Sequence, residues 1–325
     1  MRTYKQTYIF IILAIAIMLF AYIIDNYADE HILMIINFIG ISIILTVSLN
    51  ITNGFTGLFS LGHPAFMAIG GYVTALLTFP IAKRALFLPD FPQELATLQL
   101  SFAPALLIGG VISALIAMIV GFSVLRLKGH YLAVATMGFL IIVQVLINSF
   151  DSITRGPQGL NGLEELTNIY WVFGWVLLVI YVAWKIKFSS LGRSMLAIRE
   201  DEIAAKSLGV NLFHTRNFAF ILGAFFAGIS GGLWAHLVTA LTPNTFSLIM
   251  SFNIILIIVI GGTGSITGSI IATIFFALFT EFLKPFEESY SLFGASQIIT
   301  AIILILILIF RPTGLFGTKE PSFLK

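Results

Sequence analysis

The sequence of 325 residues contains no cysteine, and only 10% of its residues are charged. The absence of cysteine excludes disulfide bonds, thiolate metal sites and a cysteine nucleophile. A soluble globular chain carries about 25% charged residues, so the low charge and the mean hydropathy of +1.03 exclude that class. The formal net charge of +2 is too small to indicate nucleic acid as a partner.

Acidic and basic side chains are also missing from the middle of the long apolar segments. Ion-driven carriers place such groups within the membrane, so their absence argues against a proton- or sodium-driven carrier. His63, His130 and His236 lie near the ends of apolar segments, where packed or interfacial histidines are common. The chain has no Gly-x-x-x-x-Gly-Lys-Ser/Thr sequence, and therefore no phosphate-binding loop for ATP. It also lacks the clustered acids, histidines or nucleophile of a metal site or a membrane enzyme.

Apolar segments dominate the chain, and several approach or exceed the roughly 18 residues of a membrane-spanning helix. Continuous apolar runs such as 298–310 do not alternate as the strands of a membrane β-barrel do. We therefore expect an all-α, polytopic membrane protein, with residues 1–325 forming a single transmembrane domain. The ten expected spans lie at residues 8–24, 31–50, 63–79, 103–125, 130–148, 169–185, 217–238, 246–262, 267–283 and 295–310.

The first span follows Arg2 and Lys5, as a signal peptide would. It is longer than the apolar core of a signal peptide and has no small-residue cleavage signal after it. We therefore interpret it as a retained helix.

Basic residues divide unevenly between the two sides that these spans define. Of the 17 basic residues, only Lys83, Arg84, Arg155 and Lys284 fall on the side opposite the N-terminus. Lysine and arginine accumulate in cytoplasmic segments. The asymmetry predicts that both termini, and the segment 188–216, face the cytoplasm.

The segment 188–216 is the one long stretch that reads as a water-soluble helical element. Glu202 and Lys206 are spaced as a favourable i,i+4 ion pair, and Gly209 is placed to end the helix with a positive φ angle. Asp201 could cap a second short helix if the segment bends just before it. An amphipathic helix lying on the membrane surface would carry more basic and bulky apolar residues, so docking to a protein is favoured. The apolar residues expected on one face are Met195, Ile198, Ala205 and Leu208.

Two turn-like sequences resemble each other, Gly54-Phe55-Thr56-Gly57 and Gly261-Gly262-Thr263-Gly264, each between two spans. Many transporters consist of repeated halves with glycine-interrupted helices at the site, although glycine clusters at helix junctions also arise without a repeat. Irregular backbone within a membrane can line a cavity, but a cytoplasmic turn explains the first cluster equally well. The candidate residues for a translocation path are Gly54, Thr56, Gly57, Ser60, His63, Tyr131, Thr136, Gly261, Thr263 and Gly264.

One expected span carries small residues at every fourth position. Such spacing favours close packing of helices, within the chain or between subunits, over a ligand site. The residues are Gly223, Ala227, Gly231 and Ala235.

Motifs spread over residues 53–317 resemble one known family, the permeases of branched-chain amino-acid ABC importers, and most closely its LivM-like half. They are Asn53-Gly54-Phe55-Thr56-Gly57, Leu127-Lys128-Gly129-His130-Tyr131-Leu132-Ala133, Gly156-Pro157-Gln158-Gly159-Leu160, Leu191-Gly192-Arg193 with residues 197–211, Gly261-Gly262-Thr263-Gly264-Ser265, and Arg311-Pro312-Thr313-Gly314-Leu315-Phe316-Gly317.

The resemblance implies a multi-pass transport subunit of the bacterial plasma (inner) membrane that is not itself an enzyme. It implies a second permease subunit, two cytoplasmic ATPase subunits and an extracytoplasmic solute-binding protein as partners. ATP and Mg would be held by the ATPase subunits, and this chain would bind no cofactor or metal.

By the same resemblance, the segment 188–216 is the coupling loop that receives the ATPase. Its implied coupling residues are Gly192, Arg193, Ala197, Arg199, Glu200, Asp201, Glu202, Ala204, Ala205 and Gly209. The general importer signature is Glu-Ala-Ala-x-x-x-Gly. Here Ile203 occupies the glutamate position and Glu202 precedes it, so the individual contacts stay unassigned.

The expected function is ATP-driven import of branched-chain or other hydrophobic amino acids by alternating access. Within the same class, the alternative substrate is urea or a short amide. The alternative from another class is a passive channel for small neutral solutes, against which the coupling loop argues.

Overall fold

The computed structural model describes residues 2–88, 92, 97–127, 129–290, 294–311, 314–315 and 317. Regular structure in these residues is almost entirely helical, apart from a ribbon in which β1 (Leu160–Asn161) pairs antiparallel with β2 (Ala240–Leu241). The expectation of an all-α, polytopic membrane protein is confirmed. Four residues of the motifs quoted above, Lys128, Pro312, Thr313 and Phe316, lie outside the described residues.

Each of the ten predicted spans falls on a helix. These helices are α1 (Arg2–Tyr27), α2 (Glu30–Leu49), α3 (His63–Thr78), α5 (Phe102–Val124), α6 (His130–Ser149), α8 (Ile169–Lys187), α11 (Leu212–Val238), α12 (Leu248–Gly261), α13 (Ile266–Tyr290) and α14 (Ala295–Phe310). Within the described residues, seven helical segments are long and apolar enough to cross a membrane, and they belong to α2, α5, α6, α8, α11, α12 and α13. The apolar parts of α1 and α14 are shorter, and α3 has 16 residues. A count of ten crossings therefore stays a prediction.

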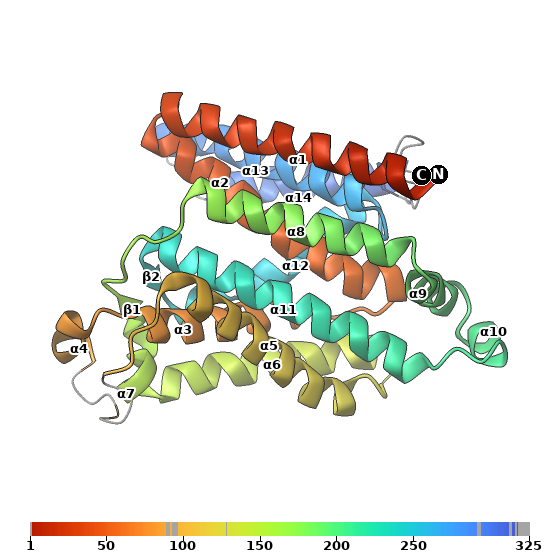
Figure 1. The fold of residues 1–325 in the computed structure, drawn as a ribbon, viewed down its shortest axis with the longest axis horizontal. Helices are drawn as coiled ribbons and strands as arrows, with labels where there is room; N and C mark the ends of the chain where they lie inside the picture. Colours follow the sequence, from red (N-terminus) through yellow and green to blue (C-terminus); the bar gives the residue numbers. More distant parts are fainter. Residues whose placement is uncertain are drawn as a thin grey trace.

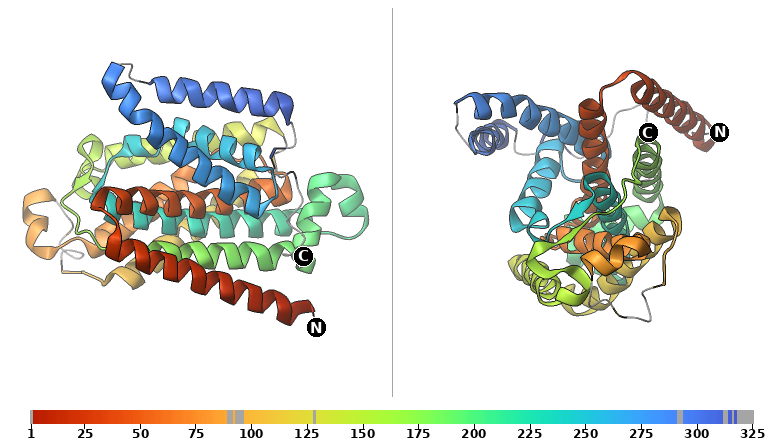
Figure 2. Two further views of the ribbon diagram at one scale, coloured as in Figure 1. Left: turned by 90° about the horizontal axis from the view of Figure 1, so that it is seen from above. Right: turned by 90° about the vertical axis from the view of Figure 1, so that its left-hand side faces the viewer.

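The long helices run side by side, and short elements lie at the two ends of the bundle (Figure 1). At one end lie α4 (Ile81–Phe87) and α7 (Asp151–Thr154), and at the other lie α9 (Ser190–Glu200) and α10 (Glu202–Ser207). The helix α11 occupies the core, where it packs against α2, α3 and α5. In Figure 2, α1 lies on one side of α2, while α13 and α14 lie on the other.

Two helices are interrupted at the α9 end of the bundle. The helix α2 continues into a π-helical turn, η1 (Asn50–Gly54), and regular structure resumes at α3. The helix α12 ends at Gly261, and α13 begins at Ile266. Both interruptions coincide with the two glycine motifs that resemble each other in sequence.

Glycines allow α3, α5 and α11 to pack with their backbones in contact. A Cβ atom on Gly70 of α3 would overlap the backbone of Gly228 on α11, and one on Gly109 of α5 would lie 2.7 Å from the carbonyl oxygen of Gly70. In a membrane, such close approach gives the van der Waals contact that holds helices together. The sequence pattern did not single out these three glycines.

The face of α11 with small residues at every fourth position packs within the chain. Ala227 and Ala235 are fully buried. A Cβ atom on Gly223 would overlap the Thr52 hydroxyl of η1, and one on Gly231 would overlap the Met67 carbonyl oxygen of α3. In this chain the face therefore joins α11 to its own α2–η1 segment and α3.

Gly231→Ala should lower the midpoint of thermal unfolding of the detergent-purified protein, because the added methyl group meets the Met67 carbonyl. Overpacking of this kind costs about 1–3 kcal/mol. The matched control is Gly174→Ala in α8, where the new Cβ atom meets nothing within 4 Å. This control should keep or raise the midpoint, because alanine is favoured over glycine in a helix by about 0.5–1 kcal/mol. Equal midpoints for the two variants would contradict the packing argument.

Candidate functional site

The segment 188–216 begins with a capped helix that is docked on the bundle. The Ser189 hydroxyl accepts a hydrogen bond of 3.1 Å from the backbone N–H of Gly192 and so caps α9. A side chain on Gly192 would overlap the Ile186 carbonyl at the end of α8, which explains the glycine. Met195 and Ile198 are buried, and the apolar face of α9 therefore holds the segment against the membrane helices.

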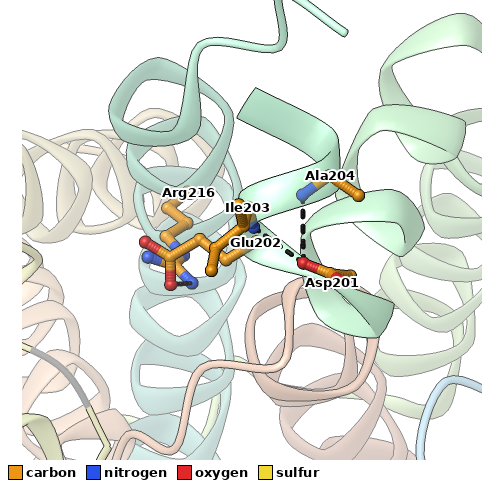
Figure 3. Close-up of polar contacts among 5 residues, drawn as sticks. All are labelled: Asp201, Glu202, Ile203, Ala204 and Arg216. Carbon is orange, nitrogen blue, oxygen red and sulfur yellow. Dashed lines mark hydrogen bonds and ion pairs between the residues drawn. The ribbon is translucent and has the colours of Figure 1, made fainter. Parts of the chain in front are cut away.

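The helix breaks at Asp201, as predicted, and a second helix starts there. Asp201 has extended backbone angles, and its Oδ1 atom accepts hydrogen bonds from the backbone N–H groups of Ile203 (2.8 Å) and Ala204 (3.0 Å) (Figure 3). This side chain satisfies two of the donors that the first turn of a helix leaves unpaired. The result is a change of direction between α9 and α10.

Gly209 ends α10 with a φ angle of +82°, as predicted. The N–H of Val210 donates to the Ala205 carbonyl, and the N–H of Gly209 donates to the Lys206 carbonyl. This pair of bonds is the Schellman arrangement, which requires a left-handed residue. A Cβ atom on Gly209 would meet nothing within 4 Å, so backbone conformation alone demands glycine here.

An ion pair fastens α10 to the start of α11. The Arg216 Nη2 atom lies 3.2 Å from Glu202 Oε2, with both side chains mostly buried (Figure 3). The sequence predicted Lys206 as the partner of Glu202, because only local spacing is visible in a sequence. Arg216 lies in the next helix, beyond the reach of that local spacing.

Two large apolar side chains, one in α10 and one directly after it, are exposed. Ile203 is 83% exposed and Leu208 is 81% exposed. The expectation that Leu208 shares the buried face of Met195, Ile198 and Ala205 is wrong. After the break at Asp201, Ala205 is still buried against the bundle, whereas Leu208, directly after α10, is exposed. Figure 1 shows α10 extending beyond the ends of the long helices.

Arg199, the last basic residue of α9, binds both helix interruptions. Its Nη1 atom donates to the carbonyl oxygens of Gly54 (2.8 Å) and Thr263 (3.0 Å), and its Nη2 atom donates to the Thr263 hydroxyl (3.3 Å). Guanidinium is planar with several fixed donors, so one side chain can bind two separate loops. A cavity of about 210 Å³ beside it is lined in part by Asn53 and Val259. We call this set of contacts the Arg199 junction.

Two further polar side chains complete the Arg199 junction. The Asn50 amide donates to the Ser265 carbonyl and to the Ser269 hydroxyl, each at 2.8 Å, and its Oδ1 atom accepts from the Gly264 N–H at 2.8 Å. The buried Lys187 ammonium donates to the Gly264 carbonyl at 2.6 Å. Backbone groups exposed by a helix break inside a membrane protein need such partners. Neither Asn50 nor Lys187 is among the site residues expected from the sequence.

The two similar glycine motifs therefore meet in space, and they share part of their conformation. The fourth position of each has a positive φ angle, +72° at Gly57 and +83° at Gly264. The second position differs, because Gly262 has a φ of +109° whereas Phe55 is helical. The hydroxyl of Thr56 donates to the carbonyl of Thr52, while that of Thr263 accepts from Arg199.

The other predicted path residues separate into two groups. Ser60, His63 and Thr136 are buried. His63 Nε2 lies 2.8 Å from the Ser48 hydroxyl, and the Thr136 hydroxyl accepts from the Leu61 N–H at 2.9 Å. These contacts join the start of α3 to α2 and α6.

Tyr131 is 77% exposed on α6 and lies apart from these residues. Its place on the surface of α6 gives it no part in the polar contacts between α2, α3 and α6. Across the described part of the chain, no group of histidine and acidic side chains is arranged to hold a metal ion.

Residues 31–310 match the family model described as "Branched-chain amino acid transport system / permease component". The chain belongs to this family. It is 31% identical over 316 residues to the high-affinity branched-chain amino acid transport system permease protein LivM of Escherichia coli strain K12, covering 87% of this chain and 69% of that protein. The corresponding LivH protein of the same strain is 22% identical over 296 residues, covering 85% and 91%. No solved structure matches the chain.

Membership in this family confirms the resemblance inferred from the motifs, and it makes the chain a permease subunit of a transporter. In this permease, the family motif near the C-terminus also reaches the Arg199 junction. The Leu315 N–H donates to the Ile260 carbonyl at 2.7 Å, and Gly314 packs against the backbone of Gly262. Motifs that lie far apart in the sequence thus converge at one end of the bundle.

Arg199→Lys should loosen both helix interruptions, because an ammonium cannot bind the Gly54 and Thr263 carbonyls in the same fork geometry. A hydrogen bond to a charged group contributes about 1.5–3 kcal/mol. Amide hydrogen exchange at residues 54–57 and 262–265 should therefore accelerate roughly tenfold or more. The control, Arg193→Lys, changes an exposed arginine on the same helix and should leave that exchange unchanged. Unchanged exchange in Arg199→Lys would show that the Arg199 junction does not hold the loops.

Proposed function

We propose that this permease is the membrane subunit of an ATP-driven importer that carries branched-chain amino acids across the bacterial plasma membrane by alternating access. The observation that carries the proposal is the Arg199 junction, by which the loop 188–216 binds two helix interruptions at once. A loop joined in this way can pass a push from outside the membrane to the helices that would open and close a path.

Two cytoplasmic ATPase subunits are the proposed source of that push. Exposed Ile203 and Leu208, beside the charged residues Glu200 and Lys206, have the composition of a protein-docking surface, in which apolar residues are surrounded by polar ones. The extension of α10 beyond the long helices (Figure 1) suits contact with a soluble partner better than contact with lipid. ATP and Mg would bind to those subunits, and a second permease subunit would complete the membrane part.

The loop is built to move as one unit. The pair of Glu202 and Arg216 ties α10 to α11, and Arg199 ties α9 to the interruptions before α3 and before α13. Displacement of α10 would therefore act on three places in the bundle. This supports coupling residues at Arg199, Asp201, Glu202 and Gly209.

Branched-chain amino acids are the proposed substrates because the relatives LivM and LivH bear that transport system in their names. Urea or a short amide is the alternative within the same class of importer. A passive channel would take up solute without ATP, and the docked loop would then have no coupling function. Uptake of labelled leucine with and without ATP, in vesicles that hold all partner subunits, separates these possibilities.

An extracytoplasmic solute-binding protein is the proposed source of substrate at the other end of the bundle. There, Arg155 has a left-handed conformation and its guanidinium lies over the Phe87 ring, 5.3 Å from the centroid. The adjoining strand β1 is pinned to β2. A turn held this firmly, next to the exposed Glu164 and Glu165, offers a defined surface for docking.

Cysteine labelling tests the proposed orientation in this cysteine-free chain. Ser207→Cys in α10 should react with a membrane-impermeant thiol reagent only from the cytoplasmic side. Thr97→Cys, between α4 and α5, should react only from the outside. Both positions are exposed, so neither result depends on burial. Labelling of Ser207→Cys from outside would overturn both the orientation and the coupling role of the loop.

Gly209→Val should abolish ATP-driven leucine uptake, because a β-branched residue with a positive φ is strongly disfavoured and α10 would end in a different direction. Gly209→Asn is the matched control, since asparagine tolerates the left-handed conformation, and it should retain most of the uptake. Glu202→Ala should weaken the hold of α11 on α10 and reduce uptake, while leaving Arg216 without this partner.

The three variants should insert into the membrane in normal amounts. Uptake in vesicles with all partner subunits is the measurement, together with ATP hydrolysis. Wild-type uptake by the double variant Gly209→Val, Glu202→Ala would mean that the loop is only a connector.

A further inference from the structure

A groove of about 430 Å³ lies between α2, α11, α12 and α13, and its lining shares no residue with the Arg199 junction. All four helices are long and apolar enough to cross a membrane. The volume falls in the range of roughly 300–1,000 Å³ that is usual for small-molecule sites. None of the path residues expected from the sequence lines this groove.

Two threonines border the groove from two sides, and each is only 1% exposed in this structure. Thr46 of α2 donates to the Ser42 carbonyl at 2.6 Å, and Thr273 of α13 donates to the Ser269 carbonyl at 2.7 Å. Each hydroxyl has used its one proton on the backbone of its own helix and retains an acceptor lone pair. Asn253 of α12 adds an amide to the same groove. The hydroxyl oxygens can accept hydrogen bonds from an ammonium group, and the Asn253 NH2 group can donate to a carboxylate.

The end of the groove farthest from α9 carries one charge of each sign. Lys284 Nζ lies 2.6 Å from Glu281 Oε2, and both residues line the groove. A zwitterion has the same pair of charges, so it can exchange partners with this ion pair on entry without leaving a charge unpaired.

The remaining wall is apolar. Phe38 of α2 and Trp234 of α11 lie with their ring centroids 4.8 Å apart, and Ile254 and Phe276 line the groove with them. Such a wall favours an aliphatic side chain over a fully polar solute, because the burial of apolar surface against it is favourable.

The helix α13 and the continuation of α2 into η1 extend from the groove to residues of the Arg199 junction. One helical turn beyond Thr46 and Thr273 lie Asn50 and Ser269, which are joined by a hydrogen bond of 2.8 Å. Asn50 also binds Gly264, whose neighbour Thr263 is held by Arg199. Arg199 is therefore linked to the Asn50–Ser269 contact through Thr263, Gly264 and Asn50.

We propose that this groove is the passage for substrate, that it takes a zwitterionic amino acid with an aliphatic side chain, and that the Asn50–Ser269 contact is its inner gate. The proposal rests on the proposed import function and adds the substrate site to it. Hydroxyl oxygens of Thr46 and Thr273 receive the ammonium group, and the apolar wall receives the side chain.

Single cysteines in the cysteine-free chain test the groove. In vesicles with the assembled transporter, Thr273→Cys should react with a quaternary-ammonium methanethiosulfonate, which requires water at the thiol. The matched control is Phe275→Cys on the same helix, half exposed but outside the groove, which should stay unlabelled in lipid. Leucine should slow the labelling of Thr273→Cys at least threefold, while urea should not. Equal labelling of both positions, or no protection by leucine, would overturn the proposal.

Removal of the hydroxyls gives a second measure that does not depend on labelling. Thr46→Val and Thr273→Val should each raise the KM for leucine uptake about tenfold, the loss of one hydrogen bond to a charged group. Thr74→Val is the control, a buried threonine of α3 with the same bond to its own helix, and should leave KM unchanged. An unchanged KM in the groove variants would overturn the site.

Leucine uptake by the unaltered transporter in the same vesicles keeps the two hypotheses apart. Uptake by the unaltered protein with no effect of the groove variants would refute the groove and leave the proposed function standing. Failure of the unaltered protein to take up leucine would refute the proposed function. Protection by urea in place of leucine would likewise refute the assigned substrate class.

Discussion

The guanidinium of Arg199, bound to the backbone of two helix interruptions, is the contact on which the architecture of this permease depends. A helix break within a membrane protein exposes carbonyl and amide groups that lipid cannot satisfy. Here those groups are satisfied by side chains from other segments: Arg199 from the loop, Lys187 from the end of α8 and Asn50 from the end of α2. The breaks are stable only because these donors and acceptors come together.

The same contacts would allow the interrupted helices to shift together with the loop. A continuous helix would resist bending, whereas two broken helices held by one arginine can shift when that arginine moves. The loop that carries Arg199 is itself stiffened by the Asp201 cap, the Gly209 turn and the pair of Glu202 and Arg216. We infer that force applied at α10 reaches the Asn50–Ser269 contact through the backbone of the loop and three hydrogen bonds, from Arg199 to Thr263, from Gly264 to Asn50 and from Asn50 to Ser269.

Close packing of the core provides the fixed frame against which such a movement would occur. The glycines of α3, α5 and α11 bring three backbones into contact. In the most apolar stretch of α11, 72% of the residues are buried. In contrast, only 28% of the residues in the most apolar stretch of α13 are buried, and α13 forms one wall of the groove. The less buried helix is thus one of those that border the proposed passage.

The sequence by itself determined the helices and the local turns. Apolar runs predicted ten segments that all fall on helices, although not their ends, because a run of that length has few other ways to satisfy its backbone in a membrane. Asp201 and Gly209 were predictable because a cap and a left-handed turn depend on neighbours within a few residues. Only the tertiary structure decided that Asn50 binds Gly264, 214 residues away, that Arg216 pairs with Glu202, and that Tyr131 lies on the surface. Such contacts depend on how the helices pack, and helix packing in a membrane is set by shape and hydrogen bonding between distant segments, which local periodicity does not encode.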